Sequence, residues 1–304
     1  MIYTVTCNPA IDYVVQLSGS LKQGEINRNQ SEAFHLGGKG INVSHMLREL
    51  GHDSVSFGFV AGFTGEALEN GLKAGGLSTH FIHVNEGMTR INVKVKATEE
   101  TEINGIGPVI TEGDLEKLYA ELAHLESGDF LVLSGSLPKG LPATCYEDIM
   151  KRLAGKGIHM IVDAAGELLL HTLKHHPFLI KPNHHELAEI LGKLLATEEE
   201  ILAGAQVLQK MGAKNVLVSM AGDGAVLLDE DGRVHRMHCP KGQVISSVGA
   251  GDSMVAGFLA GMIETKDYAY ALKLGVAAGS ATAFSVGLAT KEQVSELLKI
   301  DLSI

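Results

Sequence analysis

Short apolar runs of strand length alternate with helical segments along most of the chain, and this alternation restricts the fold more than any other feature of the sequence. Continuous apolar runs are typical of strands that are buried on both faces. Strands separated by helices pair in parallel, because each helix carries the chain back to the same edge of the sheet. We therefore expect a three-layer α/β fold, with a mostly parallel central sheet between two layers of helices. The expected strands are 2–6, 54–60, 130–134, 160–162, 178–180 and 215–219, and the expected helices start near 65, 111, 143, 166, 251, 268 and 291.

Two segments depart from this alternation and have the character of an exposed sheet. Residues 89–97 alternate polar and apolar side chains with a period of two, and residues 13–34 show a weaker form of the same pattern. A sheet with one exposed face needs a cover. We expect a small β-sheet lid, formed by about 13–35 and 87–107, that folds over a site and offers a surface to a second subunit.

The composition limits the classes of partner. With 45% hydrophobic residues among 304, and no repeat or linker, the sequence predicts one domain over 1–304. A net charge of −11 argues against a nucleic-acid ligand, because no basic excess exists to neutralise a phosphate backbone. Three widely spaced cysteines indicate neither disulfides nor a zinc site, and the longest apolar stretches are too short to cross a bilayer. These features predict a cytoplasmic protein that does not contact membranes.

A turn of small residues before the helix near 251 predicts a site for a negatively charged ligand. Its glycines allow the backbone amides of Gly249, Ala250 and Gly251 to point together, and the helix adds the positive end of its dipole. An idle carboxylate beside this turn would repel an anion, so we interpret Asp252 as a general base. A base next to an anion site suits phosphoryl transfer to an alcohol. Taken alone, the pattern fits an ordinary tight helix start equally well.

A second glycine-rich loop is a further candidate for ligand binding. Gly37 and Gly38 permit close backbone approach, Lys39 supplies charge, and Asn42 is expected to face the same point from the first turn of a helix. The spacing is not that of a Walker loop. Asp12 follows the first strand in a turn-like context near the carboxyl edge of the sheet, where α/β folds bind ligands, although such an acid more often serves only as a cap.

Polar residues also follow several other expected strands. Ser136, Asp163 and Lys181 each come soon after one. Asn183 and Glu186 lie three positions apart at a helix start, so both can face one point and hold waters around Mg²⁺. An asparagine cap with a glutamate in the first turn explains the same spacing, and without further context it is the favoured interpretation.

Taken together, these motifs resemble the paired signatures of the PfkB, or ribokinase-like, carbohydrate kinases. The matching segments are 36–44, 248–252, 8–12, 134–138, 181–186 and 275–279. The resemblance spans the whole chain and implies a ribokinase-like fold. A nicotinamide-dependent oxidoreductase is disfavoured, because neither glycine-rich turn completes the Gly-x-Gly-x-x-Gly pattern. A non-catalytic sugar-phosphate sensor on the same fold is another alternative, against which the presence of Asp252 argues.

The resemblance implies a role for each candidate position. It implies that Asp252 is the base and that residues 249–251 hold the transferring phosphoryl group. The positions implied to bind the sugar phosphate are Asp12, Gly37, Gly38, Lys39, Asn42, Arg90, Ser136 and, from a neighbouring subunit, Arg28. The positions implied to border the nucleotide are Lys181, Asn183, Ser219, Gly222 and Gly224, with Glu186 facing Mg²⁺ through water.

The activity implied is ATP-dependent phosphorylation of a phosphorylated ketohexose. Residues 89–94 and 101–108 most resemble the branch of the family that converts fructose 1-phosphate into fructose 1,6-bisphosphate. Tagatose 6-phosphate is the close alternative and fructose 6-phosphate a further one, because a ketofuranose carries CH₂O groups at both ends. ATP and Mg²⁺ are the implied cofactors, and the sequence leaves open whether K⁺ binds beside Ser246 and Val248. The resemblance also implies a homodimer formed through the lid sheets.

Overall fold

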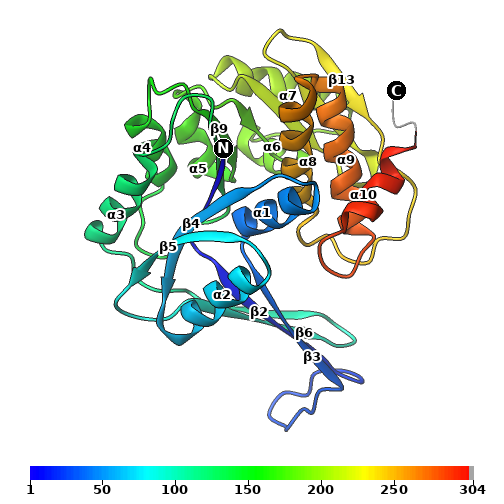
Figure 1. Cartoon of the computed structure of the whole chain (residues 1–304). Coiled ribbons are helices and arrows are strands. Elements are labelled where there is room, and N and C mark those ends of the chain that lie inside the picture. The colour runs from blue at the N-terminus through cyan, green and yellow to red at the C-terminus, as the bar shows by residue number, and fades with distance from the viewer. Residues whose placement is uncertain (301–304) are drawn as a thin grey trace.

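The computed structural model describes residues 1–300 and contains two β-sheets (Figure 1). The strands of the central sheet are β1 (Ile2–Thr6), β4 (Ser54–Ala61), β5 (Ser78–Val84), β8 (Phe130–Ser134), β9 (His159–Asp163), β10 (Leu179–Ile180), β11 (Asn215–Ser219), β12 (Ala225–Leu228) and β13 (Val234–Met237). Their order is β13-β12-β11-β10-β9-β8-β1-β4-β5. Neighbours from β11 to β5 pair in parallel, and β12 and β13 extend one edge as antiparallel strands. The predicted, mostly parallel sheet is confirmed.

Helices cover both faces of the central sheet, which confirms the predicted three-layer arrangement (Figure 1). They are α1 (Lys39–Glu49), α2 (Gly62–Ala74), α3 (Glu112–Leu122), α4 (Cys145–Arg152), α5 (Gly166–Leu173), α6 (His184–Leu191), α7 (Glu198–Lys210), α8 (Ala250–Thr265), α9 (Tyr268–Ala283) and α10 (Lys291–Leu298). Successive residues of β8 enter separate cores. Leu131 belongs to the core that includes residues of α3 to α7, and Val132 belongs to the core that includes residues of α1, α8, α9 and α10. Within residues 1–300, no helix has the length and apolar character needed to span a membrane.

The lid sheet consists of β2 (Ala10–Gln16), β3 (Ser31–Gly37), β6 (Arg90–Lys96) and β7 (Thr101–Asn104), in the order β3-β2-β6-β7. Its near end packs through Ile11, Leu36 and Ile91 against the core under α2, and its far end projects away from the other layers (Figure 1). The strands fall within the two predicted lid segments, except that β2 starts earlier and β3 ends later. Asp12 consequently lies inside a strand, and our expectation of a turn there was wrong, because pairing with β6 begins directly after Pro9.

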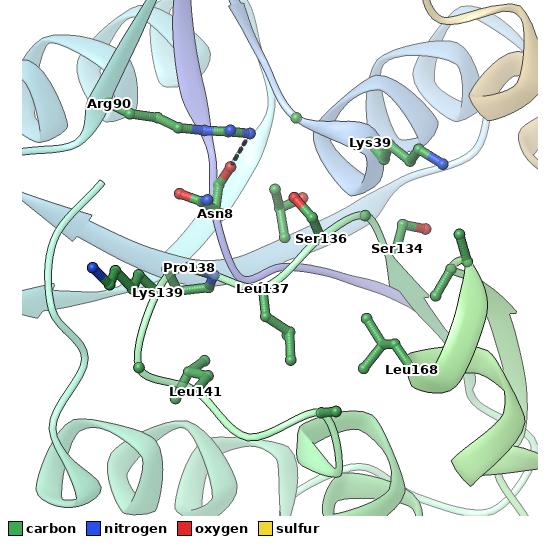
Figure 2. A pocket seen from close by; sticks show the side chains of 17 residues that line it. Asn8, Lys39, Arg90, Ser134, Ser136, Leu137, Pro138, Lys139, Leu141 and Leu168 are labelled. Atoms are coloured by element: carbon green, nitrogen blue, oxygen red, sulfur yellow. Dashed lines mark hydrogen bonds between the residues drawn. The ribbon is translucent and has the colours of Figure 1, made fainter. Parts of the chain in front are cut away.

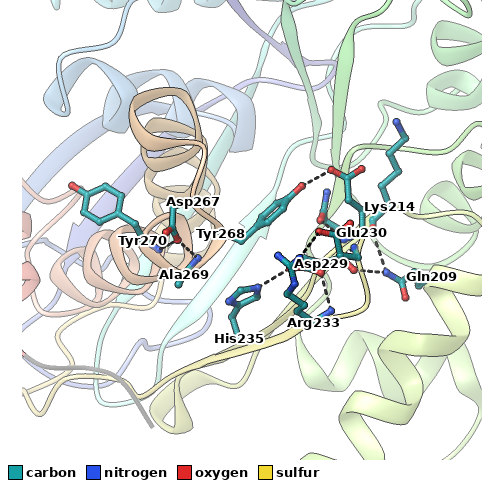
Figure 3. Close-up of polar contacts among 12 residues, drawn as sticks. Gln209, Lys214, Asp229, Glu230, Arg233, His235, Asp267, Tyr268, Ala269 and Tyr270 are labelled. Carbon is teal, nitrogen blue, oxygen red and sulfur yellow. Dashed lines mark hydrogen bonds and ion pairs between the residues drawn. The ribbon is translucent and has the colours of Figure 1, made fainter.

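A polar cluster closes the edge of the central sheet where the hairpin between β12 and β13 meets α9 (Figure 3). The buried carboxylate of Asp229 accepts hydrogen bonds from the amides of Asp231 and Arg233, and from Nε2 of His235 at 2.8 Å. Burial acts to raise the pKa of Asp229, but these bonds hold it below its ordinary value. Because β12 is antiparallel to β11, this hairpin lies at the end of the sheet opposite the turn that follows Ser219. We therefore assign the cluster to stability.

Candidate active site

The residues predicted to form a site gather at the carboxyl edge of the central sheet. Asp163 ends β9, Lys181 follows β10, and Ser219 ends β11. The amino ends of α1 and α8 reach the same edge, because Lys39 pairs with Asp163 and Gly251 lies beside Lys181. A hydrogen bond also joins Asn42 to Asp252 across 210 positions of sequence. Parallel strands place their carboxyl ends together, which explains why residues so distant in the chain meet here.

The carboxylate of Asp252 is held in the first turn of α8, where the residue is only 5% exposed. The helix begins at Ala250, directly after Gly249 takes a left-handed conformation with a φ of 79°, and no side chain caps this end. Nδ2 of Asn42 donates to Oδ2 of Asp252 at 2.8 Å, which leaves Oδ1 for a ligand. Because α1 begins at Lys39, Asn42 lies in the first turn of that helix, as predicted.

The turn before α8 offers two free amides rather than the three that we expected. The Ala250 amide donates to the carbonyl of Ser247 at 3.3 Å. The amides of Gly249 and Gly251 have no acceptor within residues 1–300. A Cβ atom at position 251 would lie 3.1 Å from Nζ of Lys181, so the lysine reaches the backbone of this turn. A lysine ammonium and free amides at a helix start together form a site for an anion.

Two lysines and a buried carboxylate form an ion-pair cluster beside Asp252. Oδ1 of Asp163 is 3.2 Å from Nζ of Lys181, and Oδ2 is 3.7 Å from Nζ of Lys39. Burial acts to raise the pKa of Asp163, but the positive charges of the lysines outweigh it and hold the pKa below its ordinary value. The charge of Asp163 in turn raises the pKa of Lys39.

Burial, and next the negative charge of Asp163, raises the pKa of Asp252 to about 6, although the hydrogen bond from Asn42 and the charges of Lys39 and Lys181 act in the opposite direction. A carboxylate with this pKa is largely ionised at neutral pH and is more basic than an ordinary aspartate. The environment of Asp252 therefore suits a group that accepts a proton during a reaction.

A cavity of about 590 Å³ opens between the lid and the sheet edge (Figure 2). Among the predicted residues, Gly38, Lys39, Arg90 and Ser136 line it. Nη2 of Arg90 donates to the carbonyl of Asn8 at 2.9 Å, and burial lowers the pKa of this arginine, with the nearby charge of Asp12 acting against it. The cavity walls also include Lys139, Asn8 and Ser134, to which our sequence analysis gave no role.

The remaining predicted sugar-binding residues lie outside this cavity lining. The carboxylate of Asp12 accepts a hydrogen bond from Asn92 and lies near Lys94, on the strand beside Arg90. Gly37 ends β3 next to Asn42, since a Cβ atom at position 37 would lie 3.5 Å from Oδ1 of that residue. Arg28 is exposed in the loop between β2 and β3, at the far end of the lid.

The predicted nucleotide-binding residues are brought together at the ends of β10 and β11. Asn183 forms an isolated bridge with Ser219, and the amide of Ser219 donates to the carbonyl of Pro182 at 3.2 Å. Gly222 and Gly224 form the tight turn that follows. A Cβ atom at Gly224 would lie 2.0 Å from the carbonyl oxygen of Met237, so the hairpin itself requires this glycine.

The family model for pfkB family carbohydrate kinases matches residues 5–294. The chain belongs to this family. A 1-phosphofructokinase of Bacillus subtilis (strain 168) is 45% identical over 298 residues, which cover 98% of this chain and 97% of that protein. A D-tagatose-1-phosphate kinase of Bacillus licheniformis is 39% identical over 289 residues, which cover 95% of this chain and 94% of that protein.

Similar solved structures agree with the predicted architecture. Phosphofructokinase-2 from Escherichia coli in complex with potassium has a TM-score of 0.91 and 29% identity, with 98% of this chain and 97% of that chain covered. Ribokinase of Arabidopsis thaliana, solved with ribose and ATP, has a TM-score of 0.81 at 22% identity over 99% of both chains. The predictions of a PfkB-family member and a ribokinase-like fold are confirmed.

Asn183 and Glu186 form a reciprocal capping box at the start of α6, so the capping interpretation is correct for these two side chains. The box uses Oε2 of Glu186 and leaves Oε1 for a ligand. Within residues 1–300, no group of three or more His, Cys, Asp or Glu side chains is placed to bind a metal directly. The negative charge of Glu186 contributes to the raised pKa of Lys39, after the larger effect of Asp163.

Asp163 is the site residue that the sequence analysis left without a role. Its position after an expected strand was visible, but the aspartate belongs to no matching segment of the kinase signatures. Asp163 matters to the site because it forms ion pairs with both Lys39 and Lys181, which are 142 positions apart in the chain (181 − 39). The available signal was a carboxylate at the carboxyl end of a buried strand, next to a strand that is followed by Lys181.

Proposed function

We propose that this chain is an ATP-dependent kinase that converts fructose 1-phosphate into fructose 1,6-bisphosphate. The observation that carries the proposal is the 45% identity to the Bacillus subtilis 1-phosphofructokinase across 98% of this chain. The site chemistry supports it, because a buried base and an anion site at a helix start are what phosphoryl transfer to an alcohol requires.

The cavity under the lid would hold the sugar phosphate. Lys39, Arg90 and Lys139 bring three positive charges to this cavity, although the whole protein has a net charge of −11. Such a local excess favours a phosphorylated ligand. Arg90 would hold the phosphate that the substrate already carries, while Ser136 and Asp12 would bind sugar hydroxyls. The backbone at residues 37–38 would approach the sugar closely.

Asp252 would act as the general base. Its Oδ1, which is not bonded to Asn42, would accept the proton of the substrate hydroxyl. At the same time the hydroxyl oxygen of the substrate would attack the γ-phosphorus of ATP in line. The bond from the γ-phosphorus to the bridging oxygen breaks, and ADP leaves with the electron pair. Asn42 orients the carboxylate throughout, so the proton is accepted at one defined oxygen.

The anion site would stabilise the charge on the transferring phosphoryl group. The free amides of Gly249 and Gly251 and the ammonium of Lys181, which lies beside Gly251, would bind this group, whereas the amide of Ala250 remains bonded to Ser247. Asn183, Ser219, Gly222 and Gly224 would border the nucleotide. A hydrated Mg²⁺ facing Glu186 would neutralise phosphate charge when bound.

Tagatose 1-phosphate is a second candidate substrate. The observation that favours it is the 39% identity to the Bacillus licheniformis D-tagatose-1-phosphate kinase. The two ketohexose 1-phosphates differ only in the configuration at C4, so a single hydroxyl contact would decide between them. Tagatose 6-phosphate, the alternative suggested by the sequence, differs from both in the position of its phosphate.

We also propose that the chain forms a homodimer through its lid sheets. Phe34, Tyr13, Val93 and Ile103 are paired in register across all four lid strands and form one row on a single face. Phe34 is 64% exposed and Ile103 63% exposed at the two ends of this row. A second copy would cover this row and bring Arg28 toward its partner's sugar site. Phe34→Asp should yield monomers in light scattering with weaker sugar-phosphate binding, and a fully active wild-type monomer at micromolar concentration would contradict the dimer.

A potassium ion beside Ser246 and Val248 is a further proposal, supported by the potassium complex of Escherichia coli phosphofructokinase-2. The amide of Val248 donates to Oγ of Ser246 at 3.3 Å, so the two residues form a tight turn next to the anion site. Replacing K⁺ by tetramethylammonium at constant ionic strength should lower kcat. An unchanged kcat would exclude a role for K⁺ in catalysis.

The decisive experiment compares substrates. ADP release is measured with Mg-ATP and fructose 1-phosphate, tagatose 1-phosphate, tagatose 6-phosphate or fructose 6-phosphate, and the values of kcat/KM are compared. We expect the highest value for fructose 1-phosphate. A preference for either tagatose phosphate would reassign the substrate and keep the mechanism, whereas no ADP release with any of them, together with tight binding, would favour a sugar-phosphate sensor.

A further inference from the structure

One buried side chain of the lid, Asn92, fixes the carboxylate that is expected to bind the sugar. Asn92 is 8% exposed and lies on β6 directly opposite Asp12 on β2. Its Nδ2 donates to Oδ1 of Asp12 at 2.8 Å. The second oxygen of Asp12 lies 3.7 Å from Nζ of Lys94, two positions further along the same strand. Asp12 is therefore held at both oxygens by residues of a single neighbouring strand.

The other end of the Asn92 amide ties this carboxylate to the wall of the cavity. Oδ1 of Asn92 accepts a hydrogen bond from the amide of Gly105 at 3.2 Å. Gly105 packs tightly against β6, since a Cβ atom there would lie 2.9 Å from Cβ of Arg90. The segment that contains Gly105 also lies against Asn8, whose carbonyl accepts the hydrogen bond from Arg90. A Cβ atom at Gly107 would lie 2.7 Å from Oδ1 of Asn8.

We propose that Asn92 is a positioning residue for the sugar-phosphate site, acting through Asp12 and without touching the substrate. It rests on the proposed function, because it assumes that Asp12 binds a substrate hydroxyl. The side-chain amide of Asn92 donates to the carboxylate of Asp12 and accepts from the segment beside Arg90. It would therefore set the distance between Asp12, which holds the hydroxyl, and Arg90, which holds the phosphate. A carboxylate fixed before the substrate arrives loses less conformational freedom on binding.

Kinetic constants of Asn92→Ala, Asn92→Asp and the matched control Asn104→Ala test this role. Asn104 is an exposed asparagine that pairs with Asn92 in the β6–β7 ladder. For Asn92→Ala we expect the KM for fructose 1-phosphate to rise about tenfold, kcat to change less than about threefold, and the KM for ATP to stay constant. Asn104→Ala should match the wild type.

Asn92→Asp separates positioning from packing, because aspartate keeps the shape and the acceptor for Gly105 but replaces the donor to Asp12 by a carboxylate. At pH 8 we expect its KM for the sugar phosphate to rise at least as much as that of Asn92→Ala. If wild-type KM is retained with aspartate at position 92, the residue only fills space and the inference is wrong. The aspartate variant also decides the question should the alanine variant not fold.

A double-mutant cycle with Asp12→Ala completes the test. If Asn92 acts through Asp12, adding Asn92→Ala to Asp12→Ala should change the KM for the sugar phosphate less than about twofold. A further tenfold increase would show an independent role and overturn the inference. The outcome is distinct from a failure of the proposed function, since that failure would appear as absence of ketohexose-phosphate kinase activity in the wild-type protein.

Discussion

Removing the hydrogen bond from Asn42 should move the pH profile of catalysis toward alkaline pH. Nδ2 of Asn42 donates to Asp252 at 2.8 Å and stabilises its ionised form, while burial and Asp163 keep the pKa near 6. A hydrogen bond to a charged group contributes about 1.5 to 3 kcal/mol, and one pKa unit corresponds to about 1.36 kcal/mol. Asn42→Ala should therefore raise the pKa of Asp252 by about one to two units.

The sign and size follow from the ionised fraction of the base. With a pKa of about 6, roughly nine-tenths of the Asp252 carboxylates are ionised at pH 7 in the wild-type protein. With a pKa of about 7 to 8, the ionised fraction falls to between about one half and one tenth. The loss of proton acceptance alone should thus lower kcat/KM at pH 7 by about two- to tenfold, and it should disappear near pH 9.

The assay is the pH dependence of kcat/KM for fructose 1-phosphate between pH 5 and pH 9.5, at saturating Mg-ATP. The position of the acidic limb reports the base even if Asn42→Ala also weakens sugar binding and lowers the whole curve. Asp163→Asn is the control of opposite sign, because removing that negative charge should lower the pKa of Asp252 and move the limb to more acidic pH. Limbs that do not move, or that move in the same direction in both variants, would refute the electrostatic account of Asp252.

Three further changes have defined outcomes. Asp252→Asn should lower kcat by several orders of magnitude yet raise the free energy of unfolding by up to about 3 kcal/mol at pH 8. The folded-state pKa of Asp252 is about two units above 3.8, so ionisation of the carboxylate destabilises the fold increasingly between pH 4 and 6. Urea denaturation should show the gain in stability at pH 8 but not at pH 4. Arg90→Ala should raise the KM for the sugar phosphate by about 10- to 100-fold with little change in the KM for ATP. If the variant and the wild type have the same KM for the sugar phosphate, another residue holds the phosphate. Asp229→Ala should lower the free energy of unfolding by about 2 to 4 kcal/mol by leaving three donors without their acceptor, while kcat per folded molecule stays constant; a loss of kcat would connect that hairpin to catalysis.

The sequence was sufficient for the layers of the fold and for bringing two of the proposed site residues to one place. Buried strands are apolar throughout and alternate with helices, and that pattern has few solutions other than a parallel sheet with helices on both faces. Asn42 and Asp252 could be placed at one site although 210 positions separate them, because each lies at a glycine-rich helix start, and such starts collect at the carboxyl edge of the sheet.

Features that depend on side-chain contacts between distant elements could not be predicted in this way. Asp12 looked like a turn residue, because local turn chemistry after Pro9 does not reveal that β6, some 80 positions later, pairs with this segment. The amide of Ala250 looked free until the turn bond to Ser247 was known. The position of Asp163 after a strand was visible, but its role was not, since its surroundings are set by lysines from two other segments.

The placement of Asp163 explains how two lysines can lie beside Asp252 while the pKa of that carboxylate stays raised. Lys39 and Lys181 would repel one another if they lay at the cavity without a counterion, and direct pairing of both with Asp252 would depress the pKa of that carboxylate and weaken it as a base. Asp163 accepts both ion pairs instead and adds its own negative charge to the surroundings of Asp252. In the proposed mechanism this arrangement keeps both lysines at the phosphate site and leaves Asp252 with a pKa of about 6.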